Sequence, residues 1–230
     1  MPRNLLLLPG LLCDARLWRD VADGLVADLA QDDSMAAMAV RALALADAQW
    51  GAQSRFAVAG LSMGGYVAME LWRQASPRVT HMALLDTSAR PDTEEQRARR
   101  QALMALSRQG QFKGVTPRLL PMLIHPSRLE TPLADDVMAM ATRIGPNAFL
   151  RQQRAIMDRP DSRPMLPGIT VPTLVACGAE DILTPPDRHA EMAGLVPQAR
   201  FVQFPGCGHL PTMEDPMAVR PVLEAFLAEG

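Results

Sequence analysis

A serine flanked by glycines directly follows a short apolar run in the first third of the chain. Residues 56–59 form the run, and residues 60–64 place Ser62 with a glycine two positions before it and another two positions after it. Glycine has no side chain to collide when the backbone folds back sharply, so this spacing favours a tight turn that exposes the serine hydroxyl. Residues 66–72 are apolar enough for a buried helix. The stretch therefore predicts a strand, a sharp turn carrying Ser62 and a helix.

Composition places the chain among ordinary globular proteins. Its 230 residues are 48% hydrophobic and 21% charged, with a formal net charge of −2, which fits one α/β domain with an insertion. The near-neutral charge excludes a nucleic-acid-binding surface as the main function. Three scattered cysteines lack metal-ligand spacing, which predicts reduced thiols and no bound metal. The apolar run at residues 5–8 is too short to cross a bilayer and lacks the layout of a signal peptide, so we predict a cytoplasmic protein without membrane attachment.

Short apolar runs alternate along the chain with longer helical patterns. The predicted strands are residues 4–8, 35–40, 56–59, 82–85, 173–177 and 201–204. The predicted helices are residues 17–29, 67–74, 186–195 and 216–227. Strands that alternate with helices predict right-handed crossovers and an α/β fold with a mostly parallel sheet of about six strands.

The strand pattern stops between residues 90 and 164. This segment is rich in Arg, Gln, Met, Leu and Ala, and it carries 13 basic against 8 acidic residues. We predict a basic, helical cap over residues 90–164, inserted into a core of residues 1–89 and 165–230. The chain has no long Gly/Ser linker, which favours a cap packed on the sheet over one on a flexible tether.

A serine hydroxyl is a weak nucleophile at neutral pH, so it needs a neighbouring base that is itself oriented by an acid. Of the four histidines, only His209 lies in a Gly-rich loop directly after a predicted strand. Asp181 follows another predicted strand and precedes a Thr-Pro-Pro turn; its alternative role is to cap a helix. Asp86, at the end of a third strand, is a rival for the acid. The carboxyl ends of parallel strands share one edge of a sheet, so Ser62, His209 and either acid can meet there.

These three motifs together resemble the α/β-hydrolase fold. Gly60-Leu-Ser-Met-Gly-Gly65 resembles the nucleophile turn of that family, Gly178-Ala-Glu-Asp181 its acid turn and Gly208-His209 its histidine loop, in the family's Ser, Asp, His order. The resemblance implies catalytic residues Ser62, Asp181 and His209. It also implies an oxyanion hole built from the backbone amides of Leu11 and Met63.

Two departures from the family concern one wall of the pocket. Pro9-Gly10 stands where many relatives have His-Gly, and the glycine-containing loop expected after the strand predicted at residues 35–40 is missing. Only four residues precede the apolar run at residues 5–8, too few for the two antiparallel strands that many relatives have there, so the sheet should be small.

The resemblance implies a cofactor-independent serine hydrolase that acts on a small-molecule carboxylic ester. Lactones, thioesters and carbon–carbon bonds are alternatives for the same residues, and a perhydrolase or a non-catalytic ligand receptor is a further alternative. Apolar residues of the cap either line an adaptable substrate cavity or simply pack: Met104, Met122, Leu123, Ile124, Met138, Met140 and Met157.

Charged residues outside these motifs have two interpretations. Arg97, Arg99 and Arg100 either hold an anionic substrate or an acidic carrier protein, or form a solvated helix face. Glu214 and Asp215 precede Pro216 and are predicted to cap the last helix. His189 is predicted to be a surface or packing residue.

Overall fold

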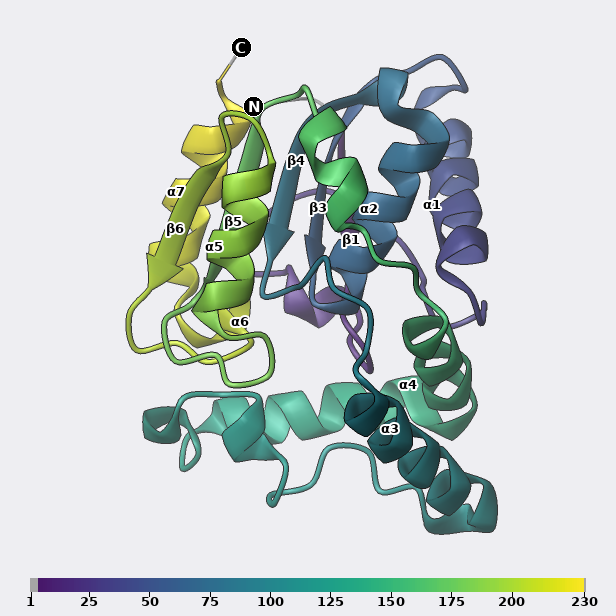
Figure 1. Ribbon diagram of the computed structural model, residues 1–230. Helices are drawn as coiled ribbons and strands as arrows, with labels where there is room; N and C mark the ends of the chain where they lie inside the picture. Colours follow the sequence, from purple (N-terminus) through teal and green to yellow (C-terminus); the bar gives the residue numbers. More distant parts are fainter. Residues whose placement is uncertain (1–3, 230) are drawn as a thin grey trace.

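Six parallel strands form the sheet at the centre of the computed structural model, which describes residues 4–229 (Figure 1). Residues 1–3 and 230 of the predicted core lie outside this range. The strands are β1 (Leu5–Leu8), β2 (Leu25–Val26), β3 (Phe56–Leu61), β4 (Val79–Leu85), β5 (Thr173–Gly178) and β6 (Arg200–Phe204), in the order β2-β1-β3-β4-β5-β6. The α/β class with a parallel sheet of six strands is therefore confirmed.

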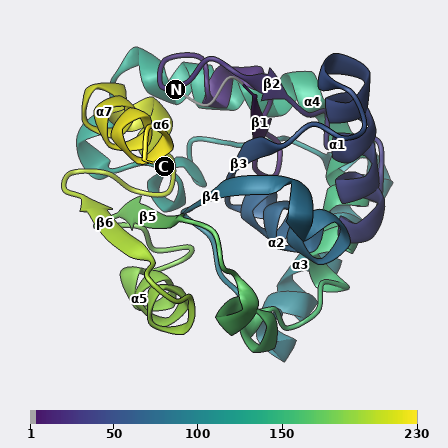
Figure 2. The same ribbon diagram turned by 90° about the horizontal axis from the view of Figure 1, so that it is seen from above.

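Helices cover both faces of the sheet (Figure 2). They are α1 (Met35–Trp50), α2 (Met63–Ala75), α3 (Glu94–Leu106), α4 (Pro132–Met157), α5 (Pro186–Leu195), α6 (Pro211–Glu214) and α7 (Pro216–Leu227). Helices α1, α2 and α5 pack on one face, and α7 packs on the other. The helices predicted over residues 67–74, 186–195 and 216–227 are confirmed as parts of α2, α5 and α7.

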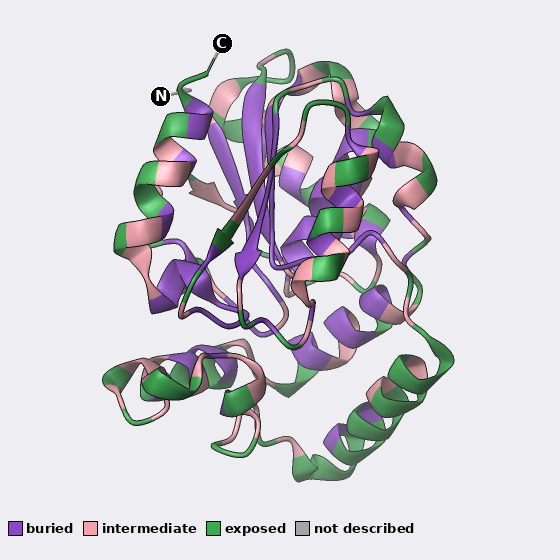
Figure 3. Cartoon of the chain, turned by 60° about the vertical axis from the view of Figure 1, so that its left-hand side comes forward, coloured by how far each residue is buried: buried purple, intermediate pink, exposed green. Residues whose placement is uncertain are grey.

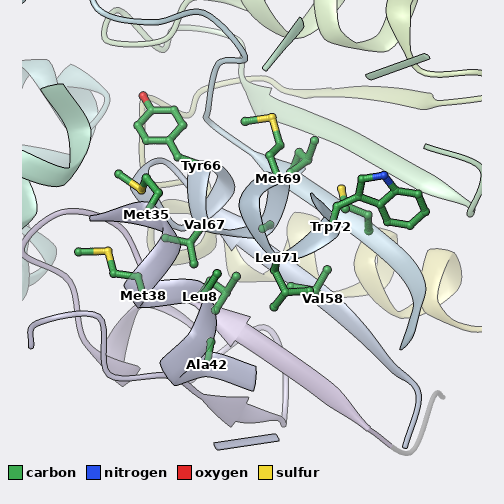
Figure 4. Packing of buried hydrophobic residues seen from close by; sticks show 14 of the residues in the cluster. Leu8, Met35, Met38, Ala42, Val58, Tyr66, Val67, Met69, Leu71 and Trp72 are labelled. Atoms are coloured by element: carbon green, nitrogen blue, oxygen red, sulfur yellow. The ribbon is translucent and has the colours of Figure 1, made fainter. Parts of the chain in front are cut away.

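The core divides according to the alternation of side chains along each strand. Leu6 and Leu8 of β1 lie in the cluster that includes α1 and α2, where Figure 4 shows Leu8, whereas Leu5 and Leu7 lie in the cluster that includes α7. All four are buried, as expected for a strand covered on both faces. This packing fixes the strand ends at one edge of the sheet.

Two predictions near the amino terminus are wrong. Residues 35–40 begin helix α1 instead of forming a strand, because Ser34 caps the helix through the amide of Ala37 and the following residues are rich in alanine, the best helix former. Residues 17–29 do not form a helix; they contain the end of a short 3₁₀ turn and the two-residue strand β2. Gly24 interrupts the helical pattern and lies so close to β1 that an added Cβ would be 2.7 Å from the carbonyl oxygen of Leu5.

The chain between β4 and β5 contains helices and turns, and its two long helices α3 and α4 lie beyond the carboxyl ends of the strands (Figure 1). Two ion pairs connect α4 to the chain that follows β1. Asp136 of α4 pairs with Arg16 at 2.8 Å, and Arg143 of α4 pairs with Asp14 at 2.8 Å. Helix α3 is mostly exposed (Figure 3). The contacts of α4 agree with the expectation of a packed segment.

Gly64 marks the closest approach between α2 and β1. A Cβ at Gly64 would lie 1.9 Å from the carbonyl oxygen of Leu8, and the three nearest atoms all belong to the backbone of Leu8 and Pro9, so no flexible side chain can give way. Gly64→Ala is expected to lower the free energy of unfolding by about 3 kcal/mol, as overpacking does. Chemical denaturation measures this loss.

Gly194 in α5 provides the control for that substitution. Nothing lies within 4 Å of a Cβ built there, so Gly194→Ala should raise stability by about 0.5–1 kcal/mol through helix propensity. A Gly64→Ala protein as stable as the parent would contradict the close packing of α2 against β1.

Candidate active site

Ser62 occupies the turn between β3 and α2 in a backbone conformation that side chains rarely adopt. Its φ is 55° and its ψ is −116°. A positive φ at a residue other than glycine costs on the order of 1–3 kcal/mol, and the surrounding structure has to hold it in place. Here the amide of Ser62 donates to the carbonyl of Leu85 at 2.9 Å, and its carbonyl accepts from the hydroxyl of Thr87 at 2.8 Å. The strained turn agrees with the sharp bend expected from the flanking glycines.

His209 lies between Ser62 and Asp181. Its Nε2 is 2.9 Å from Oγ of Ser62, and its Nδ1 is 2.8 Å from Oδ2 of Asp181. Both the histidine and the aspartate are buried. The structure therefore brings these three predicted site residues into one hydrogen-bonded chain, although they lie far apart in the sequence.

Asp181 is held by its own turn as well as by the histidine. Oδ1 accepts hydrogen bonds from the amides of Leu183 and Thr184, at 2.8 and 3.1 Å, and Oδ2 accepts one from the hydroxyl of Thr184 at 2.6 Å. Burial acts to raise the pKa of Asp181, but His209 and the Thr184 hydrogen bonds outweigh it and hold the pKa below its usual range. Asp181 is thus an ionised carboxylate that faces the imidazole. It does not cap α5, where Pro185 occupies the cap position.

Asp86, the rival acid, lies behind this chain of groups. Its Oδ1 accepts the amide of Gly178 at 2.8 Å, and its Oδ2 has no hydrogen-bond partner among the described residues. Burial, followed by the charge of Asp181, raises the pKa of Asp86 well above its usual value. Burial and the neighbouring charge therefore favour the protonated form of Asp86, and Asp181 is the carboxylate in contact with His209.

Ligand atoms of Asp86, Asp181 and His209 lie within 4.8 Å of one another, the only such group of possible metal ligands among residues 4–229. Each side chain already has a hydrogen-bond partner in the protein. An ion would have to break the contact between Asp181 and His209, so the arrangement fits proton transfer better than metal binding.

Glu214 supports the loop that carries His209, a role the sequence did not reveal. Its Oε1 accepts the amides of Gly208 and Leu210, at 2.9 and 3.1 Å, and its Oε2 accepts the amide of His125 at 2.6 Å. The predicted capping role is therefore wrong for Glu214. It is confirmed for Asp215, which accepts the amide of Ala218 at 3.0 Å. No periodic pattern marks Glu214, because its contacts depend on how α6 folds back.

The loop after β1 lies directly against Ser62. A Cβ built on Gly10 would be 3.3 Å from the Cβ of Ser62. Among the described residues, no protein group accepts a hydrogen bond from the amide of Leu11 or of Met63. Met63 is the first residue of α2, where amides have no partner within the helix. Both amides are therefore unused beside the serine.

Gln152 of α4 fixes this loop from the side of the inserted segment. Its Oε1 accepts the amide of Leu12 at 3.1 Å, and its Nε2 donates to the carbonyl of Leu29 at 3.2 Å. Leu12 has a φ of 60°, so this contact helps to hold a strained residue. The role of Gln152 could not be predicted from local sequence patterns, since its partners lie more than 120 residues away.

A cavity of about 400 Å³ opens onto Ser62 and His209 between the strand ends and the inserted helices. Most of its lining is apolar. Of the seven apolar residues of the segment 90–164 that were expected either to line a cavity or to pack, three line it: Met122, Leu123 and Met140. Met104 and Ile124 are instead buried packing residues. Arg99 and Arg100 also line the cavity.

The remaining histidine and cysteine candidates are structural. Nε2 of His189 accepts the amide of Thr87 at 2.8 Å, and burial lowers the pKa of His189 to about 4, so it is a neutral packing residue. The three cysteines are free and buried, and burial raises the pKa of Cys13 and of Cys207 to about 12. Such thiols are protonated and inert at neutral pH.

The chain belongs to the α/β hydrolase fold family, whose sequence profile matches residues 31–216. An esterase from Thermogutta terrifontis has a similar structure, with a TM-score of 0.85 and 29% identity, over 97% of this chain and 89% of that one. A protein of Mycobacterium tuberculosis named as a candidate non-heme bromoperoxidase is 29% identical over 74% of this chain and 67% of its own. A pimeloyl-[acyl-carrier protein] methyl ester esterase of Neisseria meningitidis is 25% identical over 75% of this chain and 69% of its own.

The relatives therefore include esterases, and the chain is a member of a hydrolase family with esterase-like homologues. No helix within residues 4–229 has an apolar stretch long enough to pass through a lipid bilayer.

Proposed function

We propose that the protein is a serine hydrolase that cleaves a small-molecule carboxylic ester through an acyl-enzyme. The hydrogen-bonded chain from Oγ of Ser62 through His209 to Asp181 is the observation that carries this proposal. In the neutral imidazole, Nδ1–H donates to Asp181, so that Nε2 is free to accept the proton of Ser62. Residues 90–164 act as the cap that closes the cavity over these groups.

The reaction proceeds in two halves. His209 takes the proton of Ser62 as Oγ attacks the ester carbonyl. The resulting oxyanion accepts hydrogen bonds from the backbone amides of Leu11 and Met63. His209 then returns the proton to the departing alcohol. In the second half His209 activates a water molecule, which releases the carboxylic acid and restores Ser62. No cofactor takes part in these steps.

Acylation of the serine gives a direct test. We expect an initial burst of p-nitrophenol from p-nitrophenyl esters, and covalent labelling of Ser62 by a fluorophosphonate. A panel of acyl lengths, run beside a lactone and a thioester, identifies the bond that is cleaved fastest. The absence of both a burst and a label on Ser62 would overturn the proposal.

Oxidation of halide is a second candidate, because one relative is named as a candidate bromoperoxidase. In this reaction hydrogen peroxide replaces water as the attacker of the acyl-enzyme and gives a peracid, which then oxidises bromide. Monochlorodimedone bromination in acetate with peroxide, compared with ester hydrolysis under the same conditions, separates the two activities.

The Neisseria relative is named for an ester carried by an acyl-carrier protein. A carrier-linked ester is thus one form in which the substrate could reach the site of this protein. A tenfold higher kcat/KM for an acyl-carrier-protein ester than for the free methyl ester of the same acid would favour that form.

A further inference from the structure

Positive charge dominates the polar part of the cavity wall. Five cationic side chains line the cavity together with Ser62 and His209, and a single carboxylate, Asp92, accompanies them. The cations are Arg99, Arg100, Lys113, Arg159 and Arg188. The whole chain, in contrast, has a net charge of −2. The excess of cations is therefore a property of this cavity and not of the protein as a whole.

Asp92 is shared by two of these arginines. Its side chain is 1% exposed, and its two oxygens lie 2.7 Å from Nε of Arg100 and 2.7 Å from Nη1 of Arg159. One buried carboxylate between two guanidinium groups leaves one positive charge uncompensated. Uncompensated charge in a partly buried site is costly unless a bound group neutralises it.

Arg159 is occupied by protein contacts. It lies over the ring of Tyr66, 4.3 Å from the centroid, and its donors reach Asp92 and the carbonyls of Arg90 and Ile156. Because Tyr66 is on α2 one turn after Ser62, this stack connects the arginine cluster to the helix that begins at the serine. The role of Arg159 is thus to hold Asp92 in position.

Arg100 has donors to spare. Its Nε donates to Asp92 and its Nη1 to Oε1 of Gln153 at 2.8 Å, whereas its Nη2 has no acceptor among the described residues. Two contacts fix the plane of the guanidinium, so little conformational entropy is lost when a third group binds. Arg99, Lys113 and Arg188 add positive potential without a close carboxylate partner of their own; the carboxylate nearest to Arg188 is that of Asp187, at 3.7 Å.

We propose that the substrate ester carries an anionic oxygen group, a carboxylate or a phosphate, that binds Nη2 of Arg100 while the ester lies at Ser62. This inference rests on the proposed esterase function and names its substrate class. The rest of the lining is mostly apolar, which fits an aliphatic spacer between the ester and the anionic end. The free Nη2 can donate to an oxygen of either group, and the charges on both partners strengthen that hydrogen bond.

The test compares esters that differ only in charge. Mono-p-nitrophenyl esters of dicarboxylic acids with four to eight carbons are assayed beside the neutral esters in which the far carboxylate is a methyl ester. Charge-assisted hydrogen bonds predict a kcat/KM about tenfold to a hundredfold higher for the charged ester at the best length, mainly through KM. Salt should reduce this preference. An ω-phosphate ester of the same length distinguishes phosphate from carboxylate.

Variants of two arginines on α3 make the comparison specific. Arg100→Gln should reduce at least tenfold the ratio of kcat/KM for the charged ester to kcat/KM for the neutral ester. Arg97→Gln is the matched control, because Arg97 is on the same helix, does not line the cavity, and contacts the carbonyl of Met157. It should keep the full preference.

The outcomes separate this inference from the proposed function. Equal turnover of charged and neutral esters by the parent protein overturns the anionic subsite while the esterase stands, and this result needs no variant to fold. An unchanged preference in a folded Arg100→Gln protein also overturns it. Failure of every ester, with no labelling of Ser62, removes the esterase proposal itself.

Discussion

Ser62→Ala should lower kcat for ester hydrolysis by a factor of about 10³ to 10⁶, the range expected when the nucleophile of such a triad is removed. Without Oγ, no acyl-enzyme can form, and the remaining rate is what the amides of Leu11 and Met63 and simple binding provide. The measurement is steady-state turnover of a p-nitrophenyl ester together with the size of the burst. Fluorophosphonate labelling should disappear in parallel.

Ser88→Ala is the matched control for this substitution, because Ser88 also lines the cavity and its hydroxyl contacts the amide of Arg90 instead of the imidazole. Its turnover should stay within about threefold of the parent, as expected for a residue outside the reaction. The Ser62→Ala protein should bind a product acid as tightly as the parent. If the parent protein binds ligands but hydrolyses none, the receptor alternative replaces the esterase.

The fold could be predicted where strands are long and strongly apolar. Five of the six strands overlap the short apolar-rich runs at residues 4–8, 56–59, 82–85, 173–177 and 201–204, whereas β2 has only two residues and leaves no readable pattern. The strand predicted at residues 35–40 is wrong because a short run of alanine, methionine and valine suits a strand or a helix equally well. Ser34 and the ten residues after Val40 decide for the helix.

The candidate site could be predicted because its residues follow strand ends. In a parallel sheet these ends share one edge, so Ser62, Asp181 and His209 meet without any information about side-chain contacts. The supporting residues Glu214 and Gln152 could not be found in this way. Their partners depend on the path of α6 and on the docking of α4, and neither is encoded in local spacing.

Substitution of the two buried aspartates should affect kcat to very different extents. Asp181→Asn is expected to lower kcat by about 10⁴, because an amide facing Nδ1 stabilises the tautomer with the proton on Nε2, which cannot accept the proton of Ser62. Asp86→Asn should leave kcat within a few fold, since a neutral acid is replaced by a neutral amide that can still accept the amide of Gly178. Equal losses in both variants would contradict the assignment of Asp181 as the acid.

Thermal stability measured against pH provides an independent readout for the same pair. The folded pKa of Asp86 is raised, so its contribution to stability is full below the unfolded pKa and is lost as the pH rises through the folded value. The Tm of Asp86→Asn minus that of the parent should therefore be more positive at pH 8 than at pH 4. The folded pKa of Asp181 is lowered, so its contribution is present above the unfolded pKa and is lost as the pH falls. Asp181→Asn should thus lose more Tm at pH 8 than at pH 3, which lies below the usual pKa of 3.8. The same trend in both variants would show that the two carboxyl groups do not differ in ionisation.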